Sequence, residues 1–153
     1  MADEEKKQIK FDGACAVLGL DIVGFSRMKD EDQVNAIQHL YRWITEALAN
    51  HSITHDLYRW SPAGDGGFLT FNSTRTCQKA IDVAFTICGK VRMPDWRPTT
   101  GDKLRLRLGL HAGMVTEEDD LGWKTNVWGV GINTADRILA VSAADQLLMS
   151  KQY

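Results

Sequence analysis

Two aspartates in this sequence have neighbours that suit a metal-binding role. Asp21 lies near the end of the apolar stretch ACAVLGLDIVGF, and Asp65 lies between glycines in the polar stretch SPAGDGGF. Carboxylate oxygens are ligands that Mg²⁺ and Mn²⁺ prefer, and glycine lets the backbone and a ligand approach closely. Either aspartate alone is also common turn chemistry. Together they predict a hard-oxygen metal site if the fold brings them side by side.

A second polar pair, Asn133 and Arg137, lies in the stretch NTADRILAVS. Residues four apart share one face of a helix, and the planar guanidinium of arginine suits phosphoryl oxygens. Such pairs are also common on exposed helix faces that have no function. Here Ile132, Ile138 and Leu139 can form the buried side of the helix. The spacing therefore predicts a helix that presents an amide and a guanidinium together.

Hydrophobic patterns predict the elements that position these residues. The run ACAVLGLDIVGF, which stops at Gly24, is typical of a strand covered on both faces. A helical stripe of apolar residues extends from Asp30 to Asn50. A second helix is expected to begin after Ser73 or Thr74.

The remaining segments predict further strands and helices in a mixed order. ITHDLYRW and GFLTF predict two strands joined by the loop SPAGDGG, and KLRLRLGLHAGMV predicts a half-buried strand. A polar loop, the helix NTADRILAVS and a last strand, QLLMS, follow. This order predicts an α+β sandwich of the ferredoxin-like, split βαβ kind, with a mainly antiparallel sheet and helices on one face. In such a fold the end of the first strand lies beside the hairpin, so Asp21 and Asp65 can converge.

Composition narrows the possible functions. The 153 residues are 44% hydrophobic and 25% charged, which predicts a single domain. We expect this domain at 14–153, after a polar segment at 1–13 that begins MADEEKKQIK. Eighteen Lys and Arg against 20 Asp and Glu, with the basic residues scattered, disfavour nucleic-acid binding. No apolar run resembles a signal peptide or a membrane span, so we expect a cytoplasmic protein without a membrane partner. The three cysteines suit buried thiols in a reducing compartment.

Four motifs in order resemble the class III nucleotidyl cyclases, the adenylate and guanylate cyclase catalytic domains. LDIVGFSRM is similar to their first metal-aspartate block, and SPAGDGGFLTF to the hairpin with the second metal aspartate. LRLGLHAGMV is similar to their central strand, and NVWGVGINTADRI to the block that holds the transition-state residues. The resemblance covers Ala14 to Ser150 and implies the cyclase fold.

The resemblance also implies a metal-dependent reaction. Asp21 and Asp65, assisted by the backbone of Ile22, would hold two divalent ions, Mn²⁺ or Mg²⁺. One ion would help ionise the ribose 3′-hydroxyl, and both would hold the triphosphate for in-line attack on the α-phosphate, with release of pyrophosphate. Asn133 and Arg137 would position the ribose and stabilise charge on the α-phosphate.

Further implications concern phosphate binding and assembly. Gly24, Phe25 and Ser26 are expected to bind phosphate. In the family the metal aspartates and the Asn/Arg pair of one site come from different subunits, which implies a head-to-tail homodimer with composite active sites. Family members continue past LLMS into a hairpin that often supplies a lysine to the triphosphate, whereas this chain stops at Tyr153. We expect either a shortened chain or another basic residue in that role, with candidates Arg27, Lys29 and Lys124.

The base-reading positions depart from the family pattern. Adenylyl cyclases have Lys and Asp, and guanylyl cyclases Glu and Cys, where this chain has Ser61 and Asn126. The asparagine amide offers a donor beside an acceptor, which complements the N3/O4 edge of uracil or, flipped, the N3/N4 edge of cytosine. Arg59 can only donate, and so suits uracil O4. This combination resembles the cyclases of bacterial anti-phage systems that make cyclic UMP or cyclic CMP as a signal for a separate effector protein.

We therefore expect UTP to be the best substrate and CTP the second. Two alternatives stay open: an atypical adenylyl or guanylyl cyclase, and a cyclase-homology domain that has lost catalysis and acts as a dimerising or regulatory partner. Retention of Asp21, Asp65, Asn133 and Arg137 favours an active enzyme.

Overall fold

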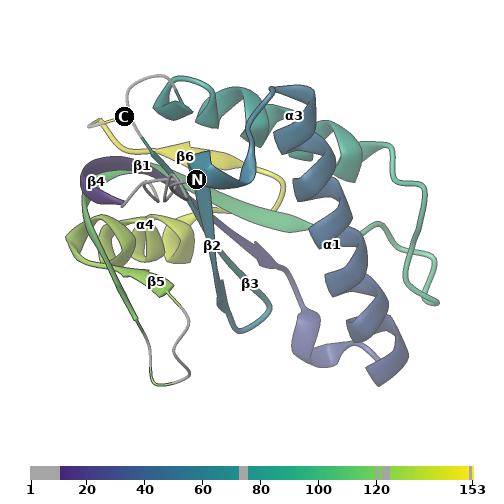
Figure 1. Cartoon of the computed structure of the whole chain (residues 1–153). Helices are drawn as coiled ribbons and strands as arrows, with labels where there is room; N and C mark the ends of the chain where they lie inside the picture. Colours follow the sequence, from purple (N-terminus) through teal and green to yellow (C-terminus); the bar gives the residue numbers. More distant parts are fainter. Residues whose placement is uncertain (1–10, 73–75, 120, 122–124, 152) are drawn as a thin grey trace, which may run out of the picture.

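The structure is a computed structural model that describes residues 11–72, 76–119, 121, 125–151 and 153. Its elements, in chain order, are β1 (Asp12–Ile22), η1 (Phe25–Arg27), α1 (Asp30–Asn50), η2 (His55–Leu57), β2 (Tyr58–Ala63), β3 (Gly66–Phe71), α3 (Ala80–Arg92), β4 (Leu106–Asp119), β5 (Thr125–Trp128), α4 (Val130–Val141) and β6 (Leu147–Met149) (Figure 1).

One sheet runs through the molecule in the order β2-β3-β1-β4-β5. All neighbours on this path are antiparallel, and β6 pairs in parallel with the first part of β4. The first four strands together with α1 and α3 follow the ferredoxin-like arrangement. The predicted α+β class with a mainly antiparallel sheet is confirmed.

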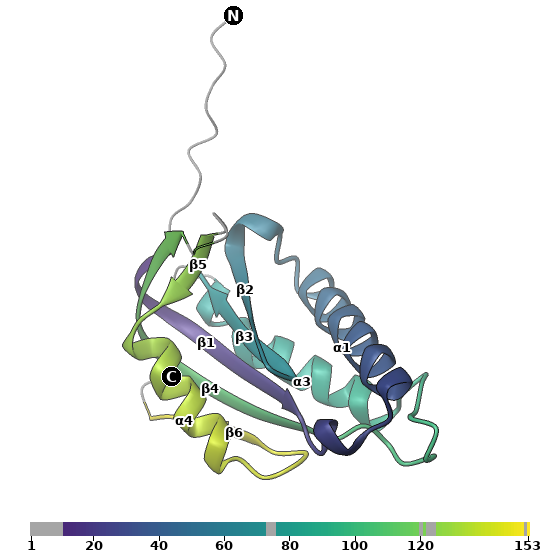
Figure 2. The same ribbon diagram turned by 90° about the horizontal axis from the view of Figure 1, so that it is seen from below.

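Alternate residues of β1 face two different cores. Leu18 and Leu20 belong to the larger core, which lies between the sheet and the helices α1 and α3. Val17 belongs to a second core, which Ala135 and Leu139 of α4 help to form. The expected placement of helices on one face therefore holds for α1 and α3, whereas α4 covers the opposite face (Figure 2). The reason is that β1 is apolar on both sides and needs two covers.

Glycines in the central strands let α4 lie close to the sheet. A Cβ atom at Gly109 would lie 2.9 Å from the backbone nitrogen of Leu139. A Cβ atom at Gly131, near the start of α4, would lie 2.9 Å from the carbonyl carbon of Gly113. The backbones of α4 and β4 are thus in direct contact, and this contact determines where the exposed face of α4 lies.

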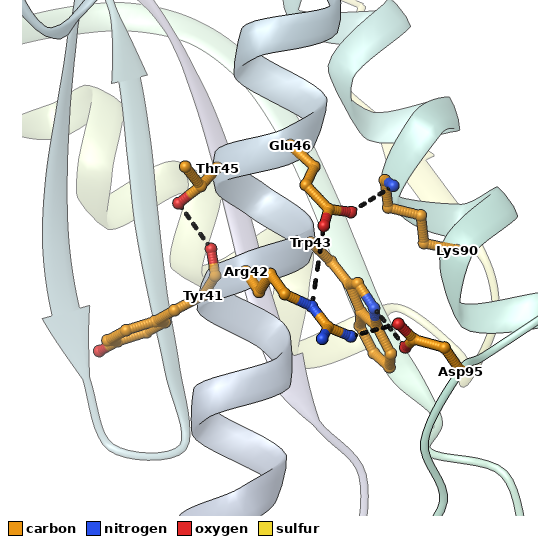
Figure 3. Close-up of polar contacts among 7 residues, drawn as sticks. All are labelled: Tyr41, Arg42, Trp43, Thr45, Glu46, Lys90 and Asp95. Carbon is orange, nitrogen blue, oxygen red and sulfur yellow. Dashed lines mark hydrogen bonds and ion pairs between the residues drawn. The ribbon is translucent and has the colours of Figure 1, made fainter.

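Polar contacts tie α1 to α3 and to the segment that follows α3 (Figure 3). Lys90 lies 2.5 Å from Glu46, and Arg42 lies 2.5 Å from Asp95. The indole nitrogen of Trp43 donates to the same Asp95 at 3.4 Å. Partly exposed ion pairs of this kind contribute about 0–1 kcal/mol each, so burial of the Trp43 ring stabilises the packing of α1 more than any one of these pairs.

The hairpin is tighter than the sequence predicts. β2 begins at Tyr58, after the short helix η2, and continues to Ala63, so that only Gly64 and Asp65 separate it from β3. Gly64 has φ of +56°, a conformation that suits glycine.

Two further differences from the sequence predictions concern β5 and the second helix. β5 is a strand where the sequence predicted only a polar loop, and the expected start of the second helix lies outside the described residues.

Two expectations from composition can be compared with the structure. Among the described helices, none has both the length and the hydropathy that a membrane span requires. The cysteines are free thiols, and burial raises the pKa of Cys15 to about 11, so this thiol is protonated at neutral pH. This state fits a packing role for Cys15.

Candidate active site

Asp21 and Asp65 come together at one edge of the sheet, as the sequence predicts. Asp21 is near the end of β1 and lies opposite Gly66 in the β1–β3 pairing, and Asp65 is the residue before Gly66. Both side chains are partly buried. Figure 2 shows the end of β1 beside the turn between β2 and β3. The topology therefore brings two carboxylates together from segments that are far apart in the sequence.

Gly66 makes this approach possible. A Cβ atom at this position would overlap the carbonyl oxygen of Leu20. We expect Gly66→Ala to lower the free energy of unfolding by about 3 kcal/mol, because the backbones of β1 and β3 must separate to admit a methyl group. Chemical denaturation measures this effect.

Gly89, at the beginning of the last turn of α3, is the matched control for that substitution. The position of its Cβ atom is open space, and alanine is a better helix former than glycine. Gly89→Ala should therefore stabilise the chain by about 0.5–1 kcal/mol. Equal effects of the two substitutions would contradict the close contact between β1 and β3.

An open cavity of about 600 Å³ adjoins the two aspartates. Residues 22–27, Gly64, Asp65 and Arg107 line it. The lining thus includes the expected metal-site residue Ile22 and the expected phosphate-binding residues Gly24, Phe25 and Ser26. Gly24 has φ of +70°, which turns the chain from β1 into η1 around the cavity. The space and the two arginines in its lining, Arg27 and Arg107, suit a phosphorylated ligand.

Arg107 is a member of this site that sequence reasoning did not identify. It lies directly opposite Asp21 in the β1–β4 pairing. Its Nε donates to Oδ1 of Asp21 at 2.9 Å, and its Nη2 donates to Oδ2 at 2.5 Å. The alternation of leucine and arginine in KLRLRLGLHAGMV predicted that Arg105 and Arg107 lie on the polar face of a strand. Only the register of the strands shows that Arg107, and not Arg105, meets Asp21.

The charges at this edge are not balanced. Burial, and then the neighbouring charge of Asp21, raise the pKa of the Asp65 carboxyl. The hydrogen bond to Asp21 and its charge raise the pKa of Arg107. Two carboxylates against one guanidinium leave a negative charge, which a divalent cation would neutralise.

The donor set fits Mg²⁺ or Mn²⁺. These ions take carboxylate and carbonyl oxygens and complete their shell with water and substrate phosphates. No group of three or more His, Cys, Asp or Glu side chains that could enclose a metal occurs among the described residues. Two carboxylates beside an open cavity, one of which lines it, favour an ion that shares its ligands with a bound triphosphate.

Ser61 and Asn126, the expected base-reading residues, lie in contact. The hydroxyl of Ser61 donates to Oδ1 of Asn126 at 2.6 Å, and the backbone N–H of Val127 donates to the same oxygen at 2.8 Å. A backbone N–H can only donate, so the atom that faces it must be the amide oxygen. The Asn126 amide is thereby oriented, and no hydrogen bond among residues 11–72, 76–119, 121, 125–151 and 153 uses its two N–H donors.

Arg59, the third expected base-reading residue, is engaged within the chain. Its Nε donates to Oε1 of Glu117 at 2.7 Å, and its guanidinium stacks 4.4 Å from the centre of the Phe11 ring. It also donates to the backbone carbonyls of His55 and Tyr58. Glu117 is only 6% exposed, so Arg59 neutralises a buried carboxylate. The expected role of Arg59 as a donor to uracil O4 therefore loses its support.

Asn133 and Arg137 lie on the exposed side of α4, whose opposite side packs on the sheet through Ala135 and Leu139. The predicted helix is thus present, and it presents both side chains to solvent. Among the described residues that line the cavity at Asp65, none comes from α4. Within one chain the structure does not bring this pair to the aspartates.

Comparisons with known proteins agree on one family. A model described as the adenylate and guanylate cyclase catalytic domain matches residues 8–153. A search among curated protein sequences found no match.

Among solved structures, a dimeric guanylyl cyclase domain of the RhoGC fusion protein from the fungus Blastocladiella emersonii has a TM-score of 0.76 and 20% identity, and the match covers 94% of this chain and 82% of that one. The guanylate cyclase domain of RhGC from Catenaria anguillulae in complex with GTP has a TM-score of 0.76 and 20% identity, and the match covers 94% of this chain and 81% of that one. The adenylyl cyclase CyaB from P. aeruginosa has a TM-score of 0.73 and 17% identity, and the match covers 94% of this chain and 79% of that one. At these identities the likeness shows the fold.

Proposed function

The chain belongs to the family of adenylate and guanylate cyclase catalytic domains, and from this premise we propose that it converts a nucleoside triphosphate, preferably UTP, into the 3′,5′-cyclic mononucleotide and pyrophosphate. The observation that carries the proposal is the convergence of Asp21 and Asp65 at one edge of the sheet, beside an open cavity that Asp65 and Arg107 line. Carboxylates for cations and a guanidinium for phosphates are the groups that a triphosphate requires.

Asp21, Asp65 and the backbone of Ile22 would hold the divalent ions in this proposal. When bound, such ions supply Lewis acidity toward the 3′-hydroxyl and the phosphates. The segment from Gly24 to Ser26 lines the cavity and would bound the space that the triphosphate occupies. Arg27 lines the cavity as well and Lys29 does not, so Arg27 is placed for a further phosphate contact, whereas Lys124 lies outside the described residues.

The complete site would form between two copies of the chain. Asn133 and Arg137 are exposed on α4 and do not line the cavity of their own chain. A second copy that placed its α4 over the cavity would bring an amide to the ribose and a guanidinium to the α-phosphate. A head-to-tail homodimer of this kind has two equivalent composite sites.

The base site presents a defined hydrogen-bonding pattern. The amide nitrogen of Asn126 can only donate, and the hydroxyl oxygen of Ser61, whose hydrogen is used on Asn126, can only accept. A base that offers an acceptor beside a donor complements this pair, as uracil does with O4 and N3–H. Cytosine does so with N3 and its amino group, guanine with O6 and N1–H, and adenine with N1 and its amino group. We place UTP first because the protruding carbonyl of uracil is easier for an amide to reach than a ring nitrogen.

The substrate preference is open to a direct kinetic test. We expect kcat/KM for UTP to exceed the values for ATP and GTP by about tenfold to a hundredfold, with CTP between them, since a purine must fit a second ring beside the same donor and acceptor. The test measures product formation with Mn²⁺ and each of the four triphosphates. Asn126→Asp, which replaces donors by acceptors, should lower the value for UTP.

Two other outcomes identify the alternatives. Faster turnover of GTP would make the chain an atypical guanylyl cyclase, which the O6/N1–H pattern also permits. No turnover of any triphosphate would favour a catalytically silent dimerisation domain.

We also propose that the cyclic pyrimidine nucleotide is a signal in anti-phage defence, read by a separate effector in the cytoplasm. The support is the departure at Ser61 and Asn126 from both purine-reading patterns. The corresponding measurement is the cellular level of cyclic UMP after phage infection. A level that does not respond to infection contradicts this role and leaves the enzymatic proposal intact.

A further inference from the structure

Both oxygens of Asp21 are engaged by one side chain. The fork of Arg107 reaches Oδ1 at 2.9 Å and Oδ2 at 2.5 Å, and the strand pairing places the two residues directly opposite each other. Such bidentate, charge-assisted pairs are among the strongest hydrogen bonds of side chains. The carboxylate expected to bind metal is therefore already occupied by a cationic group of the same chain.

Arg107 and a divalent ion would compete for this carboxylate. An ion that approached Asp21 would meet a positive guanidinium within a few ångströms, and like charges repel strongly where water is partly excluded. The Asp21 side chain is only 15% exposed, so water screens this repulsion less than it would at an open surface. Binding of the ion is therefore weaker while Arg107 stays on Asp21.

The cavity offers a place to which Arg107 can move. Its side chain is 36% exposed and lines the cavity together with residues 22–27. A triphosphate in the cavity would present oxygens that suit a guanidinium as well as a carboxylate does. The anion would draw the fork away from Asp21 and free both carboxylate oxygens. Because coupling between two ligands is reciprocal, the metal would in turn favour binding of the triphosphate.

We propose that Arg107 occupies the metal-binding carboxylate of Asp21 in the nucleotide-free protein, so that the chain binds divalent metal weakly until a triphosphate releases this arginine. The inference rests on the metal site of the proposed function. Arg107 is thus a regulatory competitor of the metal.

The test is the affinity of the nucleotide-free protein for Mn²⁺, measured from the electron paramagnetic resonance signal of the free ion. Arg107→Gln keeps a polar side chain and removes the charge, and we expect it to bind Mn²⁺ about tenfold more tightly than the natural chain. Arg107→Lys keeps the charge and loses the fork, and should fall between the two. Thermal unfolding verifies that each variant is folded, and Arg107→Lys alone decides the question if Arg107→Gln is not.

Arg105→Gln is the matched control. Arg105 lies two residues before Arg107, directly before β4, and pairs with Asp145 at 3.1 Å. Its replacement changes the net charge by the same amount and does not alter a contact of Asp21. We expect its Mn²⁺ affinity to stay within about twofold of the natural chain, because the charges are separated and screened. A gain as large as that of Arg107→Gln would show a general charge effect and overturn the proposal.

Other results separate this inference from the proposed function. Unchanged or weaker Mn²⁺ binding by folded Arg107→Gln and Arg107→Lys overturns the competition, whereas the metal site stands if Asp21→Asn abolishes the binding. Mn²⁺ binding that does not depend on Asp21 in any variant overturns both.

Discussion

Replacing either Asp21 or Asp65 by asparagine is expected to lower cyclase turnover by about a thousandfold or more, equivalent to about 4 kcal/mol of transition-state stabilisation. Each substitution removes a charged oxygen ligand and leaves the shape of the side chain nearly unchanged. Both residues lie at an edge beside an open cavity, so the cores on either side of the sheet are not disturbed. Chromatography of products gives the activity, and thermal unfolding verifies the fold.

Asp145→Asn is the control for this prediction. Asp145 is an exposed residue after α4 that pairs with Arg105, and its φ of +61° suits asparagine. It undergoes the same chemical change away from the cavity and should retain nearly full activity. Activity within tenfold of the natural chain in Asp21→Asn or Asp65→Asn would contradict the metal site.

Mixing two inactive variants is expected to restore activity. Asp21→Asn damages the metal edge, and Arg137→Ala damages α4, so each homodimer has no intact composite site. When subunits exchange freely, half of the dimers are mixed, and each mixed dimer has one intact site of two. Recovery should therefore approach about one quarter of the natural activity, as two-fold symmetry requires. The activity of the equimolar mixture, measured after incubation, tests this value.

A second mixture shows whether any recovery arises from composite sites. Asp21→Asn combined with Asp65→Asn damages the metal edge of every chain, so this mixture should stay inactive. Absence of recovery in the first mixture, while labelled subunits are seen to exchange, would mean that each chain contains a complete site. That result would contradict the head-to-tail arrangement.

The sequence predicted the convergence of Asp21 and Asp65 because it follows from topology alone. A strand that is apolar on both faces lies in the middle of a sheet, and the next hairpin then pairs along it. Arg107 needed more than topology, since only the β1–β4 register decides which arginine meets Asp21. β5 was missed because four residues without alternation carry no strand pattern and owe their conformation to the end of β4.

At the base site, too, the sequence predicted which residues meet but not how they are oriented. Resemblance to the cyclases paired Ser61 with Asn126, and the structure brings the two side chains into contact. The orientation of the amide depends on the N–H of Val127, which no pattern of residue types reveals. The hydrogen bond from Arg59 to Glu117 joins β2 to β4, which are not neighbours in the sheet, so no pattern along one strand predicts it.

The central claim, that this chain is a nucleotidyl cyclase, is tested most directly by the products of the purified protein. The measurement incubates the protein with Mn²⁺ and UTP and quantifies cyclic UMP and pyrophosphate by chromatography. In-line attack of the ribose 3′-oxygen on the α-phosphate predicts the two products in equal amounts. Formation of linear UMP with pyrophosphate, formation of UDP with phosphate, or no cyclic product from any of the four triphosphates would contradict it.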